Sequence, residues 1–146
     1  MIIRPVTASD FDAWFLLWRG YCEALGGDVP DEVSHGVWQR ILAPDQPIWC
    51  LVACDERDKP VGIAVYVLHL HTWSLKTVCY LEDLFVAPEA RGTGAARALI
   101  EELVALGRKH DWRRVYWHTE EHNYRARTLY DRIVPRTNKL RYDIDL

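Results

Sequence analysis

A β-type run passes through a glycine loop straight into a helical pattern in the 146-residue chain, and this junction limits the possible folds more than any other feature. The run Val78–Val86 is followed by Arg91, Gly92 and Gly94, and apolar residues then recur at helical spacing as far as about His110. The first amides of a helix have no partner inside it and carry partial positive charge, so such a loop suits an anion. A tight strand-to-helix turn without a ligand would have the same pattern, so the loop alone leaves both interpretations open.

Hydrophobic periodicity divides the rest of the chain into short strands and helices. Strands are predicted at residues 2–6, 48–54, 62–73, 78–86, 113–121 and 139–146, and helices at 7–27, 31–42, 94–110 and 123–133. Strands that follow one another directly favour antiparallel pairing, whereas the later strand–helix–strand steps favour parallel pairing. The sequence therefore predicts a mixed α/β (α+β) sheet flanked by helices, within a single domain spanning residues 1–146.

Charge and composition narrow the possible partners. The chain has 18 basic and 21 acidic residues, without the basic excess of a nucleic-acid-binding domain. No apolar run is long enough to span a membrane, and the N-terminus does not resemble an export signal. The four cysteines show no C-x-x-C spacing and are expected to be reduced. We expect a cytoplasmic protein that binds neither nucleic acid nor membrane.

Two common phosphate-binding loops do not fit the glycine segment. A P-loop requires a lysine directly after its last glycine, and none follows Gly94. A dinucleotide-binding loop requires a third glycine three residues further on, where this chain has Arg97.

Three motifs resemble the GNAT acetyltransferases. The segment Arg91–Ala96 matches the acyl-CoA loop of that family, Q/R-x-x-G-x-G/A. The stretch "YLEDLFV" before it is similar to diamine acetyltransferases, and "NYRARTLY" is similar to the family's later helix, N-x-x-A-x-x-L-Y. The resemblance implies one acyl-CoA N-acyltransferase domain with a mostly antiparallel sheet of six to seven strands and about four helices. The chain lacks the glycine that often follows the L-Y helix, so the C-terminal strands and any homodimer built on them stay open.

The resemblance implies that acetyl-CoA is the acetyl donor and assigns residues to it. Asn123 would contact the pantetheine arm, although it could be only a helix N-cap. Tyr130 would protonate the departing thiolate, although a tyrosine on a half-buried helix is often a core residue. The full set of expected acetyl-CoA contacts is Leu84, Phe85, Val86, Arg91, Gly92, Thr93, Gly94, Ala95, Ala96, Asn123 and Tyr130.

Two carboxylates before the loop are candidates for the acceptor side of the reaction. An alkylamine has a pKa near 10.4, so its deprotonation at pH 7 costs about 4.6 kcal/mol, and a carboxylate or water chain must assist. Glu82 is the expected base, unless it merely pairs with a basic side chain. Strand alternation predicts that Asp83 points to the opposite face, where it could attract a cationic substrate.

The leading hypothesis is therefore an N-acetyltransferase that moves the acetyl group of acetyl-CoA to a small cationic amine, by direct attack in a ternary complex. Acetylation of a protein lysine or N-terminus is an alternative, as is a CoA-binding regulatory domain without activity. His69 and His71 are predicted to share a strand face, but no third ligand is identifiable, so no metal is expected.

Overall fold

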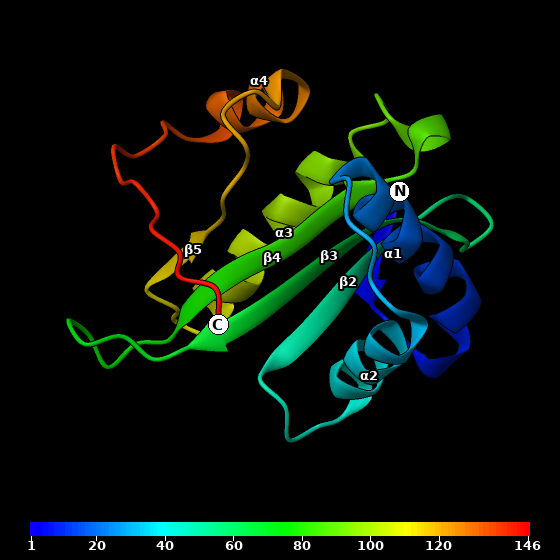
Figure 1. Ribbon diagram of the computed structural model, residues 1–146, viewed down its shortest axis with the longest axis horizontal. Helices are drawn as coiled ribbons and strands as arrows, with labels where there is room; N and C mark the ends of the chain where they lie inside the picture. The colour runs from blue at the N-terminus through cyan, green and yellow to red at the C-terminus, as the bar shows by residue number, and fades with distance from the viewer.

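The computed structural model describes residues 1–146, and its centre is one five-stranded sheet (Figure 1). The strands follow one another across the sheet in chain order, and all neighbours are antiparallel except the parallel pair β4 and β5. The predicted mixed, mostly antiparallel sheet is confirmed, with five strands in place of six or seven. The strands are β1 (Ile2–Pro5), β2 (Ile48–Cys54), β3 (Pro60–His69), β4 (Val78–Val86) and β5 (Arg114–Tyr116).

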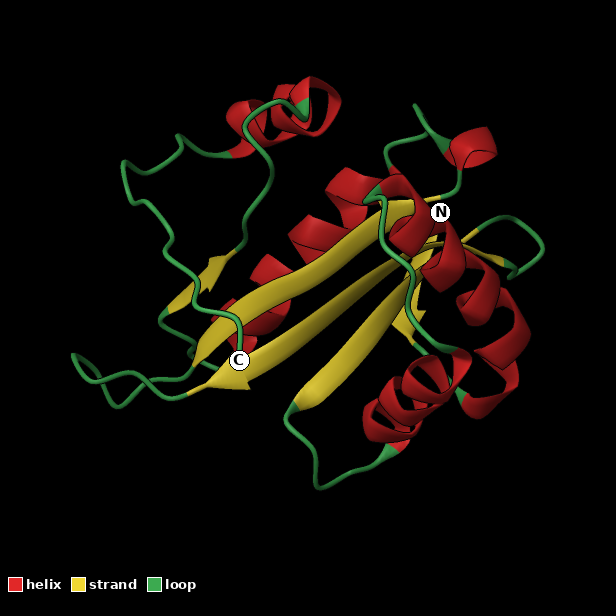
Figure 2. Ribbon diagram, viewed as in Figure 1, coloured by secondary structure: helices red, strands yellow, loops and turns green.

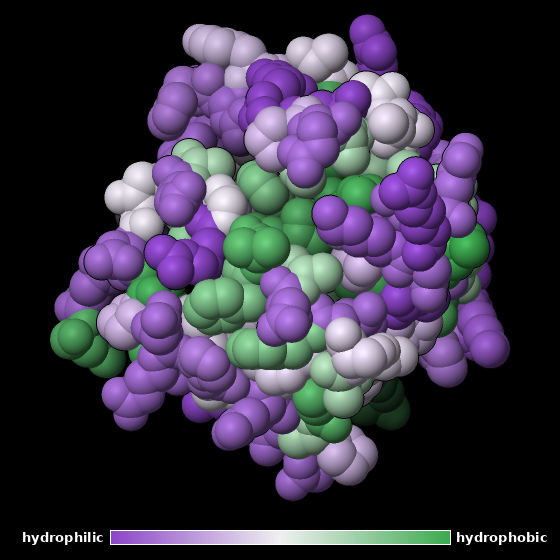
Figure 3. Space-filling model, turned by 90° about the vertical axis from the view of Figure 1, so that its right-hand side faces the viewer, coloured by the Kyte–Doolittle hydropathy of each residue, from purple (hydrophilic) through white to green (hydrophobic).

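Helices cover both faces of this sheet (Figure 2). One face carries α1 (Phe11–Ala24) and α2 (Asp31–Leu42), whose buried tryptophans pack on alternate residues of β2 and β3. The other face carries α3 (Ala95–Lys109), which buries leucines at helical spacing. A fourth helix, α4 (Tyr124–Ile133), has no fully buried residue. The outer face of α1 and α2 is largely hydrophilic around a central apolar area (Figure 3).

A partly buried ion pair between Arg4 and Asp10 fixes the start of α1 against β1. Arg4 donates hydrogen bonds to both carboxylate oxygens of Asp10, at 2.8 and 3.0 Å, and the Thr7 backbone N–H donates to the same carboxylate at 2.7 Å. The Arg4 hydrogen bonds lower the pKa of Asp10 to about 2, so this carboxylate is ionised throughout the neutral range. Asp10 thus accepts a hydrogen bond from a backbone N–H just before α1 and also connects the start of α1 to the sheet through Arg4.

The predicted closing strand is wrong. Residues 134–146 form neither helix nor strand, and every residue from 134 onward is exposed. The alternating apolar residues of this segment, Leu140, Tyr142, Ile144 and Leu146, are each at least 79% exposed. Alternation alone specified a strand, but a strand also needs a partner, and none lies beside this segment in the sheet. The predicted strand at 113–121 is likewise reduced to residues 114–116.

A β-bulge interrupts β4 at Glu82. On β3, Tyr66 pairs with Leu81 and Val65 pairs with Asp83, so Glu82 has no partner. Leu81 and Leu84 both pack on the α3 side, whereas Asp83 lies opposite Val65, which packs on the α1 side. Bulges of this kind bend a strand and redirect its side chains, often beside active sites. The expectation that Glu82 and Asp83 point to opposite faces is therefore wrong, because strict alternation does not hold across the bulge.

Candidate active site

The two carboxylates share the α1 side of the sheet but differ in burial. Asp83 is partly buried, whereas Glu82 is exposed. Burial raises the pKa of Asp83 to about 6, the Tyr21 hydroxyl partly offsets this rise, and the Glu82 charge adds to it. Two tyrosines on this side, Tyr80 and Tyr116, also have raised pKa values. Burial is the main cause, and the charge of Glu82 is the next. The bulge thus brings together two acids of different character.

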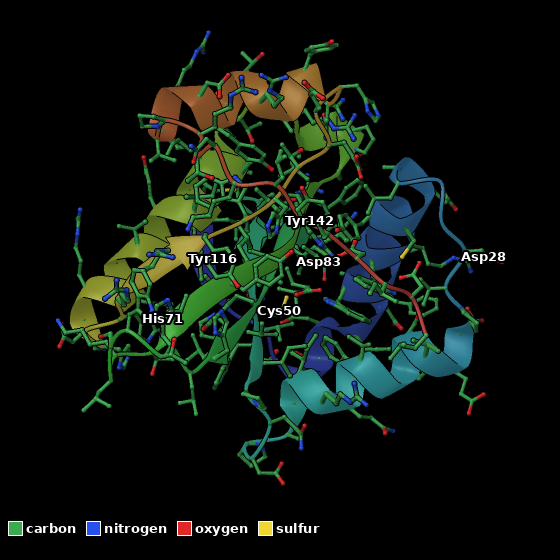
Figure 4. All side chains as sticks on the ribbon, turned by 60° about the vertical axis from the view of Figure 1, so that its left-hand side comes forward. Asp28, Cys50, His71, Asp83, Tyr116 and Tyr142 are labelled. Atoms are coloured by element: carbon green, nitrogen blue, oxygen red, sulfur yellow. The ribbon has the colours of Figure 1, made fainter.

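The neighbours of Asp83 are weakly polar groups. Burial is the main cause of the raised pKa values of four nearby residues, and the charge of Asp83 raises them further. These residues are Tyr21 and Cys22 of α1, Cys50 of β2 and Tyr80 of β4. Figure 4 shows Asp83 between α1 and Tyr116, with Cys50 close by. No cation is among these neighbours, so the ionised form of Asp83 is poorly compensated. A carboxylate with a pKa near 6 is suited to accept a proton near neutral pH.

Sequence reasoning missed Tyr21. Its ring lies edge-on to Phe85, with ring centroids 6.4 Å apart, and it packs beside Trp18 at 5.7 Å. Phe85 packs against α1 at Gly20, where a Cβ atom would lie 2.9 Å from the Phe85 ring and would force the ring to move. The helical spacing of Trp14, Trp18 and Tyr21 did indicate that Tyr21 faces the sheet. It could not show which strand residue the Tyr21 hydroxyl would lie beside.

The glycine loop has the backbone of an anion cradle. Gly92 and Gly94 have φ values of +80° and +89°, which side chains rarely adopt. A Cβ at either glycine would meet no protein atom within 4 Å, so the space beside both is open. The six backbone N–H groups of residues 92–97 donate no hydrogen bond to the protein, and α3 begins at Ala95. These features fit a phosphate-bearing ligand at the N-terminus of α3.

Side chains of the loop hold its shape. Thr93 donates from its hydroxyl to the Ala90 carbonyl at 2.7 Å. Arg91 donates from Nε to the Val86 carbonyl at 3.3 Å, and its guanidinium lies 5.9 Å from the centre of the Phe85 ring. The remainder of the guanidinium is available for an anion.

The second half of β4 has a free edge. β5 pairs only with residues 78–80, so the backbone of 81–86 has no strand on that side. The side chains of Leu84 and Val86 pack against the α3 cluster and that of Phe85 packs against the α1 cluster. If these residues bind the donor, as the sequence predicted, they must do so through backbone groups, as a strand edge does with an extended ligand.

The residues predicted from the L-Y helix lie on α4. Asn123 caps this helix, because its side-chain oxygen accepts a hydrogen bond from the Ala126 N–H at 3.3 Å. Tyr130 packs edge-on to Trp117, with ring centroids 5.4 Å apart, and burial raises its pKa. A tyrosine that remains protonated can act as a proton donor. Their predicted contacts with acetyl-CoA stay predictions.

Other candidate features lie away from these residues. β3 ends at His69, so His71 lies in the following turn and the two do not share a strand face. No group of His, Cys, Asp and Glu side chains is arranged to hold a metal ion. All four cysteines are free thiols, and no helix has the length and apolar character needed to cross a membrane. A cavity of about 380 Å³ opens at the far end of α3, beside Trp112.

Comparison with known proteins identifies the family. Residues 11–134 match the model of the Acetyltransferase (GNAT) family. The chain is 32% identical to the D-amino-acid N-acetyltransferase of Saccharomyces cerevisiae, over 97% of this chain and 89% of the relative. It is 33% identical to a peptidyl-lysine N-acetyltransferase of Escherichia coli, over 46% of this chain and 37% of the relative.

Solved structures agree with this assignment. A crystal structure of a probable acetyltransferase matches with a TM-score of 0.89 and 26% identity, covering 100% of this chain and 98% of that one. GNAT enzymes take their acetyl group from acetyl-CoA, and the cradle at residues 92–97 suits the phosphates of that donor. The chain belongs to the GNAT family and is an acetyl-CoA-dependent N-acetyltransferase.

Proposed function

We propose that this enzyme acetylates the primary amine of a small molecule that arrives as an ammonium ion, by direct attack on acetyl-CoA in a ternary complex. The observation that carries this proposal is the pair Glu82 and Asp83 on the β4 bulge, a few residues before the Arg91–Ala96 loop. An ammonium ion is attracted by the pair, and its deprotonation needs a base, which the pair can supply.

The two acids differ in burial, and this difference favours a different role for each in the reaction. Asp83, with a pKa of about 6, accepts the proton of the amine, while the exposed Glu82 attracts the ammonium ion. The sequence pattern assigned the base to Glu82. Both assignments are proposals, and substitution of each acid by its amide separates them.

Donor binding is assigned to the loop and the free edge of β4. The N–H groups of residues 92–97 would bind the phosphates, with Arg91 beside them, and the backbone of Leu84–Val86 would bind the extended arm of acetyl-CoA. When bound, acetyl-CoA supplies the activated acyl group. Asn123 would contact its pantetheine arm, and Tyr130 would donate a proton to the sulfur that leaves.

The class of acceptor has two candidates. The "YLEDLFV" segment resembles diamine acetyltransferases, which favours a diamine. The relative from Saccharomyces cerevisiae acts on D-amino acids and aligns over almost the whole chain, which favours an amino acid. Both acceptors present a primary amine, so the carboxylate pair suits either.

A turnover screen tests the proposal. Release of the CoA thiol from acetyl-CoA would be measured with diamines, D- and L-amino acids, aminoglycosides and lysine peptides. We expect thiol release that depends on a small amine. Release with lysine peptides alone would favour a protein acetyltransferase, and binding of acetyl-CoA without turnover of any amine would favour a regulatory domain.

A further inference from the structure

Four ring side chains form a continuous surface next to the carboxylate pair. Tyr80 of β4 stacks on Tyr116 of β5, with ring centroids 4.9 Å apart and an angle of 23° between the planes. His118 lies edge-on to both tyrosines, at 5.4 and 6.0 Å, and His69 lies edge-on to Tyr116 at 5.7 Å. We call His69, Tyr80, Tyr116 and His118 the aromatic floor.

Hydrogen bonds fix the orientation of these rings. The Tyr116 hydroxyl is 2.8 Å from His69 Nε2, and the Tyr80 hydroxyl is 3.1 Å from His118 Nδ1. Each tyrosine hydroxyl therefore has an imidazole partner. Rings held in this way lose little freedom when a ligand binds, so the floor is preorganised.

The floor is not covered by a helix. Val115 and Trp117 pack on the α3 side of the sheet, so the alternating residue Tyr116 points to the α1 side. On that side, α1 packs mainly on β3 and β4, and α2 packs mainly on β2. Tyr80 and Tyr116 are only partly buried, and His69 and His118 are exposed. In Figure 4 the C-terminal segment crosses in front of this region, with Tyr142 near Asp83 and Tyr116, but its residues remain exposed.

Charges around the floor are unevenly distributed. Glu82 and Asp83 follow Tyr80 on β4, so negative charge lies at one end. At the other end lies His71, in the segment after β3. Its pKa is lowered mainly by burial, and nearby positive charges lower it further: Arg113, Arg114, His69 and Lys139. Arg141 of the C-terminal segment acts on both Tyr80 and Glu82, so its charge also reaches the carboxylate end. Arg114 lies two residues before Tyr116 on β5 and therefore on the same face of the sheet, so a second ammonium group beyond the floor would meet positive charge.

We propose that the aromatic floor binds the body of the acceptor, and that the acceptor is a primary amine with an aromatic or apolar body and no second positive charge. The inference rests on the proposed function, because the reacting amine is placed at Glu82 and Asp83. Glu82 lies two positions after Tyr80 on β4, which is roughly 7 Å along a regular strand. An amine joined to a ring by a two-carbon linker can span this distance, with its ring on the floor.

The test compares three amines, 2-phenylethylamine, ethylamine and 1,4-diaminobutane. The wild-type enzyme should have its highest kcat/KM with 2-phenylethylamine. Tyr116→Leu should lower kcat/KM for 2-phenylethylamine by roughly 2- to 12-fold through a higher KM, while ethylamine turnover and the KM for acetyl-CoA stay unchanged. Tyr116→Phe keeps the ring and should keep the selectivity. Tyr124→Leu, on an exposed tyrosine of α4, is the matched control and should change nothing.

The outcomes separate the inference from the proposed function. The inference is overturned if the wild type prefers 1,4-diaminobutane, or if Tyr116→Leu affects 2-phenylethylamine and ethylamine equally. The wild-type comparison decides the first point even where Tyr116→Leu fails to fold. If the enzyme acetylates no primary amine at all, the proposed function fails and the aromatic floor has no acceptor to bind.

Discussion

Replacing Asp83 with asparagine should abolish most activity and at the same time stabilise the protein at neutral pH. The Asp83 side chain is partly buried, and no cation lies among the groups whose pKa values respond to it. An asparagine keeps the shape of the side chain but carries no charge. Loss of the base should lower kcat/KM by roughly 10²- to 10⁴-fold.

The stability gain follows from the pKa of Asp83. In the unfolded chain this pKa is close to 3.8, and in the folded protein burial raises it to about 6. Between these values the folded protein binds a proton that the unfolded chain does not, so the free energy of unfolding falls as pH rises. The wild type should lose up to about 3 kcal/mol between pH 4 and pH 7, and Asp83→Asn should not lose this contribution.

The assay is urea denaturation of both proteins at pH 4.5 and pH 8, together with pH profiles of kcat/KM. Glu82→Gln is the matched control, because it makes the same change at an exposed carboxylate, and its effect on stability should be within about 0.5 kcal/mol. Since the Glu82 charge raises the pKa of Asp83, Glu82→Gln should also move the acidic limb of the rate profile to lower pH.

Two results would refute this reasoning. The first is an Asp83→Asn protein that differs from wild type by the same free energy at both pH values, since a buried ionised carboxylate predicts a difference that grows with pH. The second is full kcat/KM in Asp83→Asn combined with a large loss in Glu82→Gln, which would return the role of base to Glu82.

Three further predictions concern the donor site and the chain end. Gly94→Val should weaken acetyl-CoA binding, measured by calorimetry, more than Gly26→Val does. Gly26 is the control because it also has a positive φ and open surroundings, and equal affinities of the two variants would argue against the cradle. Tyr130→Phe should lower kcat by roughly 10- to 100-fold with acetyl-CoA binding unchanged, whereas a purely structural tyrosine would leave kcat intact. Deletion of residues 139–146 should change the free energy of unfolding by less than about 0.5 kcal/mol, because this segment is exposed. A much larger decrease in the free energy of unfolding, measured by urea denaturation, would indicate that the segment pairs as a strand after all.

The sequence predicted well what local pattern and motif determine. β2 and β4 have the predicted bounds, and the helix after the glycine loop begins within one residue of its predicted start. The positive φ values of Gly92 and Gly94 explain why glycine occupies both positions, while the anion-binding role of the loop stays a prediction. These features depend on residues close together in the chain, so the sequence carries them directly.

The sequence could not predict what depends on pairing between distant residues. The bulge at Glu82 arises from the register of β4 against β3, and it places Asp83 on the side of Tyr21. The aromatic floor likewise joins residues 47 positions apart at His69 and Tyr116. Apolar and polar residues alternate at 139–146 as they do in a strand. A strand forms only where a neighbouring strand is available for pairing, and the local pattern does not show this.

The most direct test of the central claim is a product measurement. The enzyme would be incubated with acetyl-CoA and a mixture of 2-phenylethylamine, phenylalanine and 1,4-diaminobutane, and mass spectrometry would count acetylated amines against CoA thiol released. We predict one N-acetylated amine for each thiol, with both products reduced to a small fraction in Asp83→Asn. Thiol release at the same rate without any amine, or without an acetylated amine as product, would contradict acetyl transfer to an amine at this site.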